Sequence, residues 1–171
     1  ISIYSVWLYI LNEPEKLIQM IQSVPFDYKS GHTYGKKESL EFWHQQKKIY
    51  LEFKNNGPSL KLAFATLFLN RTNRSGIISG GPVGGLNQNS KTQIYARFNK
   101  QTLIKKINTV ASLKSKIKLT NYDALKLTKK IRNSINANNS FIFFDPPYFK
   151  QGKNLYFTSF DKRGHQKLSS E

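Results

Sequence analysis

The spacing of apolar residues predicts two helices at the start of the chain. Residues 1–12 are dense in Ile, Tyr, Trp and Leu, which is typical of a mostly buried helix. A second, amphipathic helix follows, with Pro14 early in it and an apolar face made by Leu17, Met20 and Ile21. We therefore expect the first helix to be covered by other elements and the second to have one side in water.

Two more helices are expected on either side of a strong break. Residues 26–36 are rich in Gly, Ser, Lys and Tyr and are expected to form a loop. Residues 37–54 place apolar side chains among charges, and residues 59–70 are largely apolar, so each segment is predicted to be a helix. Asn55-Asn56-Gly57-Pro58 separates them, because Gly and Pro interrupt regular structure.

The second half of the chain mixes loop, helix and strand patterns. Residues 71–95 hold five of the ten glycines and show no helical period, so we expect a loop and a hairpin there. A helix is predicted over about residues 100–113 and another over residues 123–136, with a short strand at Lys116 to Thr120 between them. Phe141-Ile142-Phe143-Phe144 is a short apolar run, the pattern of a strand buried on both faces.

This order of elements indicates an α/β fold. Helix, strand, helix and strand follow one another toward the end of the chain, as in a sheet that helices cover. Residues 26–98 do not continue the pattern, because they are helical with a glycine-rich hairpin. We therefore expect that segment to be an insertion in the α/β domain.

The charge of the chain points to a polyanionic partner. Lys and Arg number 27 and Asp and Glu number 10, which gives a formal net charge of +17. The 22 Lys against 5 Arg are of the kind that an AT-rich genome favours, but that bias does not explain why acids are so few. Nucleic acid is the physical reading, because each neutralised phosphate releases counterions. A generally basic surface is the alternative.

Several classes of protein are excluded or disfavoured by composition. No Cys is present, which excludes disulfides, thiolate metal sites and a cysteine nucleophile together. His32, His44 and His165 share no spacing that suggests a metal site, so no metal is expected. No run of about 18 apolar residues occurs, so no membrane span is expected.

The candidate chemistry lies in Asp145-Pro146-Pro147-Tyr148, directly after the predicted buried strand, where open α/β sheets bind their ligands. If the reaction is methyl transfer to an exocyclic amine, Asp145 and the Pro146 carbonyl can each accept one N–H of that amine, so that its lone pair turns toward the methyl donor. The prolines have a fixed φ and no N–H, and Tyr148 offers a ring on which a base outside the duplex can stack. The plainer alternative is a strand-ending Asp, a Pro-Pro turn and a core tyrosine.

Three stretches occur in an order typical of one enzyme family. The first is Phe144-Asp145-Pro146-Pro147-Tyr148, with the pattern Lys150 to Tyr156 and Phe160 after it. The second is Phe68-Leu69-Asn70-Arg71-Thr72-Asn73-Arg74, followed by the glycine-rich hairpin and by Ala96-Arg97-Phe98-Asn99-Lys100. The third is Asn121-Tyr122-Asp123-Ala124. Together they resemble the Dam-like class of DNA adenine-N6 methyltransferases over nearly the whole chain.

The resemblance implies a partial Rossmann-like methyltransferase sheet with an inserted, mainly helical DNA-recognition region. Residues 1–25 would be helices of the methyltransferase domain, residues 26–98 the inserted target-recognition region, and residues 99–171 the catalytic part. The donor would be S-adenosylmethionine and the substrate double-stranded DNA. A partner restriction endonuclease is possible, and the implied setting is the bacterial cytoplasm, on the nucleoid.

The resemblance also assigns roles to individual residues. The implied sets are catalytic Asp145, Pro146, Pro147 and Tyr148; cofactor-binding Asp123, Ala124 and Asp145; and nucleic-acid-binding Arg71, Asn73, Arg74, Arg97 and Lys100. Other basic residues, namely Lys36, Lys37, Lys47, Lys48 and Lys54, are expected to form a solvated helix face with a diffuse phosphate role. Trp7 and Trp43 are expected in the core, and no role is given to the histidines.

One departure from the family and three rival readings remain. The family's glycine-rich cofactor loop and the acid that holds the ribose are absent, and the Gly80–Gly85 cluster does not replace them because it follows no strand and opens no helix. We therefore expect an internal fragment that is inactive alone. The rivals are a related methyltransferase acting on cytosine, RNA or a protein amide; a nucleic-acid-binding module without activity that comes from a genuinely truncated gene; and such a module as a fragment of an enzyme.

Overall fold

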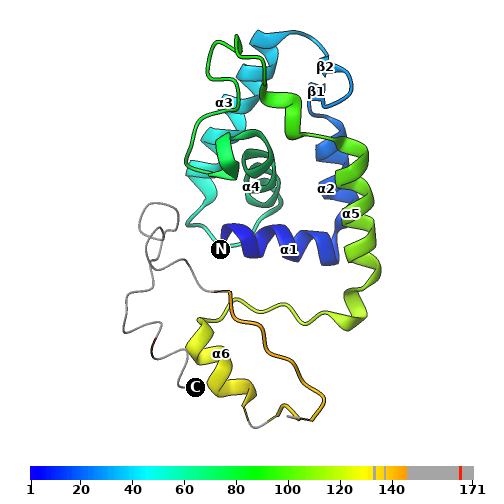
Figure 1. Ribbon diagram of the computed structural model, residues 1–171, viewed down its shortest axis with the longest axis vertical. Coiled ribbons are helices and arrows are strands. Elements are labelled where there is room, and N and C mark those ends of the chain that lie inside the picture. The colour runs from blue at the N-terminus through cyan, green and yellow to red at the C-terminus, as the bar shows by residue number, and fades with distance from the viewer. Residues whose placement is uncertain (133, 137, 146–165, 167–171) are drawn as a thin grey trace. The chain divides into compact units, whose positions relative to one another are not determined.

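The computed structural model describes residues 1–132, 134–136, 138–145 and 166. The chain divides into two compact units, Ile1–Thr120 and Asn121–Glu171 (Figure 1). The described part is mostly helical, with one small two-stranded sheet. Each unit is considered separately below.

The first unit is built around α4 (Leu60–Thr72). Ser59 caps this helix, its side chain accepting a hydrogen bond from the Leu62 backbone N–H over 3.2 Å. The side chains of α4 itself are mostly apolar on nearly all sides of the helix, which is why the helix is buried. Its neighbours are α1 (Ser2–Asn12), α2 (Pro14–Gln22) and α3 (Lys36–Phe53), and α5 (Lys100–Ser112) packs on α1 and α2 (Figure 1).

The sequence predicted these five helices to within a residue or two, but not all of their exposure. Leu17 and Ile21 are fully buried and Met20 is partly buried, as the amphipathic pattern of α2 required. Trp43 is in the core as expected. The prediction for Trp7 is wrong, because 41% of this residue is exposed on α1.

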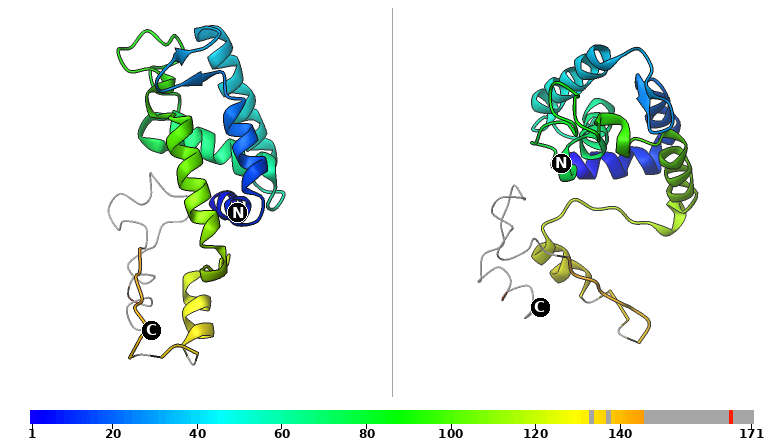
Figure 2. Two further views of the ribbon diagram at one scale, coloured as in Figure 1. Left: turned by 90° about the vertical axis from the view of Figure 1, so that its right-hand side faces the viewer. Right: turned by 45° about the horizontal axis from the view of Figure 1, so that its top comes forward.

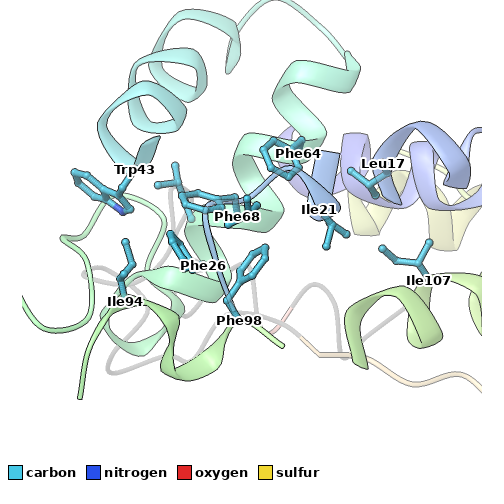
Figure 3. Packing of buried hydrophobic residues seen from close by; sticks show 11 residues of the cluster. Leu17, Ile21, Phe26, Trp43, Phe64, Phe68, Ile94, Phe98 and Ile107 are labelled. Carbon is cyan, nitrogen blue, oxygen red and sulfur yellow. The ribbon is translucent and has the colours of Figure 1, made fainter. Parts of the chain in front are cut away.

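Aromatic side chains form the centre of this unit (Figure 3). Phe68 of α4 lies with its ring centroid 5.8 Å from that of Phe26 and 5.7 Å from that of Phe98. Phe26 and Phe98 meet edge to face at 5.6 Å. These contacts hold the segment before α3 and the segment before α5 on the same side of α4. Each aromatic pair contributes about 0.5–1.5 kcal/mol of stability beyond that from the burial of its apolar surface.

A short ribbon replaces the simple loop expected between α2 and α3. Strands β1 (Phe26–Asp27) and β2 (Gly31–His32) pair antiparallel, with Phe26 opposite His32 (Figure 2). One carboxylate oxygen of Asp27 accepts from the Lys29 backbone N–H at 2.9 Å, and the other accepts from the Lys100 backbone N–H at 2.8 Å. Asp27 therefore joins this turn to the start of α5.

Residues 73–99 form a long connection with little regular structure. It contains two 3-10 turns, η1 (Arg74–Gly76) and η2 (Ile94–Arg97). The predicted hairpin is wrong in form, because the only strand-like pairing in this stretch is an isolated bridge between Asn73 and Pro82. This stretch holds five glycines and one proline, and much of its backbone lies outside helices and strands, so side chains must satisfy its N–H and C=O groups.

Unit 2 begins at Asn121 and contains α6 (Ala124–Ile131), which is shorter than the predicted helix over 123–136. The strand expected at Lys116 to Thr120 is not formed: η3 (Lys114–Lys116) and an irregular segment occupy that stretch. Phe141–Phe144 is also not a strand and is exposed, so the prediction of a strand buried on both faces is wrong.

Both failed strands have the same physical cause. A strand is stable only where a neighbour satisfies its N–H and C=O groups, and β1–β2 is the only sheet among the described residues. The α/β prediction is therefore not confirmed as a Rossmann-like sheet, and the described architecture is mainly helical. Within the described ranges, no helix is both long and apolar enough to cross a membrane.

Candidate nucleic-acid interface

Positive charge is concentrated in one continuous part of the chain. From Phe53 to Tyr122 there are twelve Lys and Arg residues and no Asp or Glu. This stretch includes α4, the 73–99 connection and α5. Its cations have no carboxylate of the same stretch to neutralise them, which produces the field that attracts a polyanion.

Asn73 organises the first turn of this connection. The side chain is fully buried at the end of α4. Its Nδ2 donates to the carbonyls of Ile77 at 2.9 Å, Ile78 at 3.0 Å and Gly80 at 3.1 Å. A fully buried amide with these partners has no group left for a direct contact with DNA, so Asn73 acts inside the fold.

Two side chains of α3 complete this arrangement. Trp43 donates its indole N–H to Oδ1 of Asn73 at 2.8 Å. Lys47 lies one turn further along α3 and donates to the carbonyls of Ile78 at 2.8 Å and Gly80 at 3.2 Å. Burial of its ammonium group lowers the pKa of Lys47 from the usual lysine value, and the nearby charge of Lys54 lowers it further. The expected solvated role of Lys47 is therefore wrong, whereas its neighbour Lys48 is exposed.

A second buried amide shapes the rest of the connection. Gln88 is fully buried in a left-handed backbone conformation, with φ 48°. Its Nε2 donates to the carbonyls of Val83 at 2.8 Å and Gly85 at 2.6 Å, and its Oε1 accepts from the Ile94 backbone N–H at 2.8 Å. The Gln88 side chain thus holds residues 83–94 in a compact turn by bonding to their backbone, and the Asn73 side chain does the same for residues 74–81.

Arg71 and Arg97 differ in what their charged groups do. The Arg71 guanidinium donates through Nε at 3.2 Å and Nη2 at 2.9 Å to the carbonyl of Arg97. Burial lowers the pKa of Arg71, and the neighbouring charge of Arg97 adds to this effect. Arg97 itself is exposed at the end of η2. The structure therefore uses Arg71 mainly to hold the backbone and leaves the Arg97 side chain in solvent.

Arg74 lies at the edge of a hollow of about 370 Å³. The hollow is lined by Arg74, Ser75, Ile77, Gly80, Gly81, Pro82, Gly85 and Leu86. Arg74 is exposed, and Ser75 after it has a left-handed φ of 55°. No atom lies within 4 Å of where a Cβ would stand at Gly81 or Gly85, so a ligand can approach the backbone closely there.

Lys100 is a structural cation of the first unit. Its Nζ donates to the carbonyl of Gln22 at 2.9 Å and also to that of Val24, at the end of α2. Burial lowers the pKa of Lys100, and Asp27 opposes this shift. A cation at a helix C-terminus stabilises the helix dipole, so Lys100 has a role in the fold beside any contact with DNA.

In unit 2, Asp123 begins α6. Its Oδ1 accepts from the backbone N–H groups of Leu125 at 3.1 Å and Lys126 at 3.3 Å, and Ala124 is the first residue of the helix. Asp145 is exposed. Pro146, Pro147 and Tyr148 lie outside the described residues, so the expected catalytic geometry around Asp145 is untested.

Sequence reasoning missed the side chains that shape the basic connection. Gln88 gave no signal, and Lys47 was grouped with solvated lysines. His32 was given no role, yet its Nδ1 is 2.7 Å from Ser39 Oγ and its Nε2 is 2.8 Å from Gln93 Oε1. The only available signal was composition: a glycine-rich stretch without strands needs polar side chains to satisfy its backbone.

Comparison with known proteins gives one match. A model of the family described as D12 class N6 adenine-specific DNA methyltransferase matches residues 2–170. Neither a curated protein nor a solved structure matches the chain. The match includes the whole basic connection as well as Asp123 and Asp145.

Proposed function

Because the chain belongs to the D12 class of N6 adenine-specific DNA methyltransferases, we propose that it takes part in methyl transfer from S-adenosylmethionine to the N6 amine of adenine in duplex DNA. The family match over residues 2–170 is the observation that carries this proposal. The sequence Asp145-Pro146-Pro147-Tyr148 and the carboxylate-free basic stretch from Phe53 to Tyr122 support it.

The proposed chemistry at Asp145 follows from the electronic structure of the target amine. The lone pair of an exocyclic amine is delocalised into the ring, so the nitrogen is a poor nucleophile. Asp145 accepts one N–H and the Pro146 carbonyl accepts the other, which favours a pyramidal nitrogen. In the transfer, the new C–N bond would form as the S–CH3 bond of the donor breaks, with S-adenosylhomocysteine as the leaving group. The nitrogen would then give up one proton to the Asp145 carboxylate that accepts its N–H. The Tyr148 ring stacks on the base once the base has left the duplex.

Asp123 is the candidate for holding the cofactor. Its Oδ1 accepts two backbone N–H groups, whereas Oδ2 has no donor among the described residues. That second oxygen suits a hydroxyl or amine of an adenosine group, with Ala124 leaving space beside it. S-adenosylmethionine, when bound, supplies the electrophilic methyl group. Asp145 would meet the cofactor only at the point where the methyl group is transferred to the amine.

We place DNA contact on the side chains that face solvent. Arg74 and Arg97 are exposed cations of the basic connection. Arg71, Asn73 and Lys100 donate to backbone carbonyls inside the first unit, so their contribution to binding is through the shape of the connection. The hollow beside Arg74 is the place for a close approach of DNA to the backbone.

The wider assignment follows the family. We propose that residues 26–98 recognise the target and residues 99–171 supply the catalytic aspartate, with residues 1–25 as part of the methyltransferase domain. An enzyme of this kind would act on the bacterial nucleoid in the cytoplasm and could be paired with a restriction endonuclease.

Incubation with methyl-labelled S-adenosylmethionine and duplex DNA tests the proposal. The chain should be tested alone and within its intact parent protein, with label expected on adenine for the parent. Label on cytosine, on RNA or on protein instead would overturn the assignment. If the parent binds DNA but transfers no label and binds no cofactor by calorimetry, the second candidate, a module that only binds nucleic acid, is correct.

A further inference from the structure

Two side chains outside the loop of residues 74–81, Lys47 and Asn73, donate to the carbonyls of that loop, and Trp43 donates to Asn73. We call this loop the Arg74 loop, and Trp43, Lys47 and Asn73 the loop clamp. Asn73 and Lys47 both donate to the carbonyls of Ile78 and Gly80. These two carbonyls therefore each accept two hydrogen bonds, which uses the full accepting capacity of an sp² oxygen.

Trp43 holds the amide of Asn73 in the orientation that makes this possible. The indole N–H occupies Oδ1, so the amide cannot rotate by half a turn without losing that bond and directing its oxygen at the loop carbonyls. The exchange would place like partial charges together in a buried site. Trp43 thus acts on the loop through Asn73.

Lys47 brings a charge to a place where a neutral donor would satisfy the same carbonyls. Its ammonium lies 5.8 Å from the Trp43 ring centroid. Among the described residues, neither of the two ion pairs involves Lys47. Lys47 therefore interacts with the loop carbonyls and the Trp43 ring, and with no carboxylate of the described residues.

We propose that Trp43, Lys47 and Asn73 are positioning residues for DNA engagement, and that they hold the Arg74 loop in its binding conformation before DNA arrives. This rests on the proposed function. A loop held in advance loses less conformational freedom on binding, so the affinity is higher than that of the same contacts made by a free loop. The clamp touches the inner side of the loop only, which leaves Arg74 and the hollow for the ligand.

The test uses two matched pairs of variants in the full chain, with a fluorescent DNA duplex as the probe. Lys47→Met and Lys48→Met remove the same charge from adjacent positions of α3, but only Lys47 contacts the loop. Trp43→Phe and Trp7→Phe remove the same indole N–H, but only Trp43 donates to Asn73. We expect Lys47→Met to weaken DNA binding roughly fivefold or more and Trp43→Phe in the same direction, with changes of less than about twofold in the controls.

Two readouts separate positioning from simple charge or stability effects. The slope of log affinity against log salt should be unchanged in Lys47→Met, whereas a lysine that neutralises a phosphate would reduce it by about 0.9. Hydrogen exchange without DNA should accelerate at the backbone N–H groups of Gly76, Ile77 and Gly80, which donate to carbonyls of residues 73–77, and remain slow in α4.

The outcomes are distinct. Equal weakening in Lys47→Met and Lys48→Met, or unchanged exchange in the loop, would overturn the clamp. If Lys47→Met fails to fold, Trp43→Phe decides alone, because it keeps an aromatic ring in the buried position. A wild-type chain without affinity for duplex DNA would overturn the proposed function instead, and with it the role of the clamp in binding.

Discussion

Trp43 and Asn73 are 30 residues apart in the chain, and the indole N–H of the first donates to Oδ1 of the second over 2.8 Å. Both residues are buried, and Asn73 also begins the connection that carries Arg74. This one hydrogen bond joins the third helix of the unit to the base of the candidate interface. The stability and the recognition properties of this region are therefore coupled.

Asn73→Ala should destabilise the first unit by about 3 kcal/mol, because it leaves the buried Trp43 N–H without its acceptor and removes one of the donors to the carbonyls of Ile77, Ile78 and Gly80. Asn70→Ala is the control, since Asn70 donates to Gly76 over 3.1 Å from a partly buried site and should cost about 1 kcal/mol. Urea unfolding followed by circular dichroism measures both. Equal losses of stability in the two variants would show that the burial of the Asn73 hydrogen bonds adds nothing to the free energy of unfolding.

Gly84→Ala should be much more damaging than Gly85→Ala. Both residues have positive φ, 86° and 72°. A Cβ at Gly84 would lie 2.9 Å from the Thr92 carbonyl oxygen and 3.0 Å from Gln93 Cα, whereas at Gly85 nothing lies within 4 Å. We expect a loss of about 1 kcal/mol for Gly85→Ala from backbone strain and roughly 2–4 kcal/mol for Gly84→Ala, which adds a clash. Thermal unfolding of the two variants side by side would reveal the difference or refute it.

Asp145→Ala should abolish methyl transfer by the intact parent protein and leave its DNA affinity nearly unchanged. The carboxylate is proposed to act on the amine lone pair in the transition state, and such groups affect turnover more than substrate binding. Single-turnover rates and a DNA titration measure the two effects. Retention of more than about a tenth of the wild-type rate, a loss below roughly 1.4 kcal/mol, would rule out this role.

Arg74→Ala and Arg71→Ala should separate binding from folding. Arg74 is exposed, so its removal should weaken DNA binding and reduce the salt dependence by about one phosphate. Arg71 donates twice to the Arg97 carbonyl, so its removal should lower stability with a smaller change in the salt dependence. DNA titrations at several salt concentrations, with an unfolding curve for each variant, provide the comparison. DNA binding by the wild type that is insensitive to salt would contradict both expectations.

Stability should rise with pH in the range just below the ordinary lysine pKa of 10.5, in part because of Lys47. Burial holds the pKa of folded Lys47 below that of the unfolded chain, so the unfolded state binds more protons in this window and the free energy of unfolding increases with pH. Below the folded pKa the charged group is a constant cost. Urea unfolding between about pH 8 and 10 should show a smaller rise for Lys47→Met than for wild type. An identical rise in both would exclude a contribution from Lys47.

Local pattern predicted the helices well because their signals are local. The apolar face of α2 needs only the spacing of Leu17, Met20 and Ile21, and the break at Asn55 to Pro58 needs only the residues themselves. Strands depend on partners elsewhere. Phe141–Phe144 has the composition of a buried strand, but composition supplies no neighbour with which to pair.

The residues of the candidate interface have different surroundings that the sequence does not distinguish. Arg71, Asn73 and Arg74 are close together in sequence, and sequence reasoning gave all three the same role. In the structure their side chains point to different surroundings: Asn73 is buried, Arg71 bonds to a carbonyl, and Arg74 is exposed. Direction depends on α3 and η2, which lie far along the chain, so no local pattern could reveal it.

The inward direction of the loop carbonyls has a consequence for how such an interface can change. The backbone path is determined by buried donors, among them Asn73 and Gln88, and not by the exposed side chains Ser79 and Asn87. Substitutions at those two positions can alter the chemical groups that meet a ligand while the scaffold keeps its shape. Single mutations at these positions can thus change the target preference without producing an unfolded variant, in evolution or in a designed library.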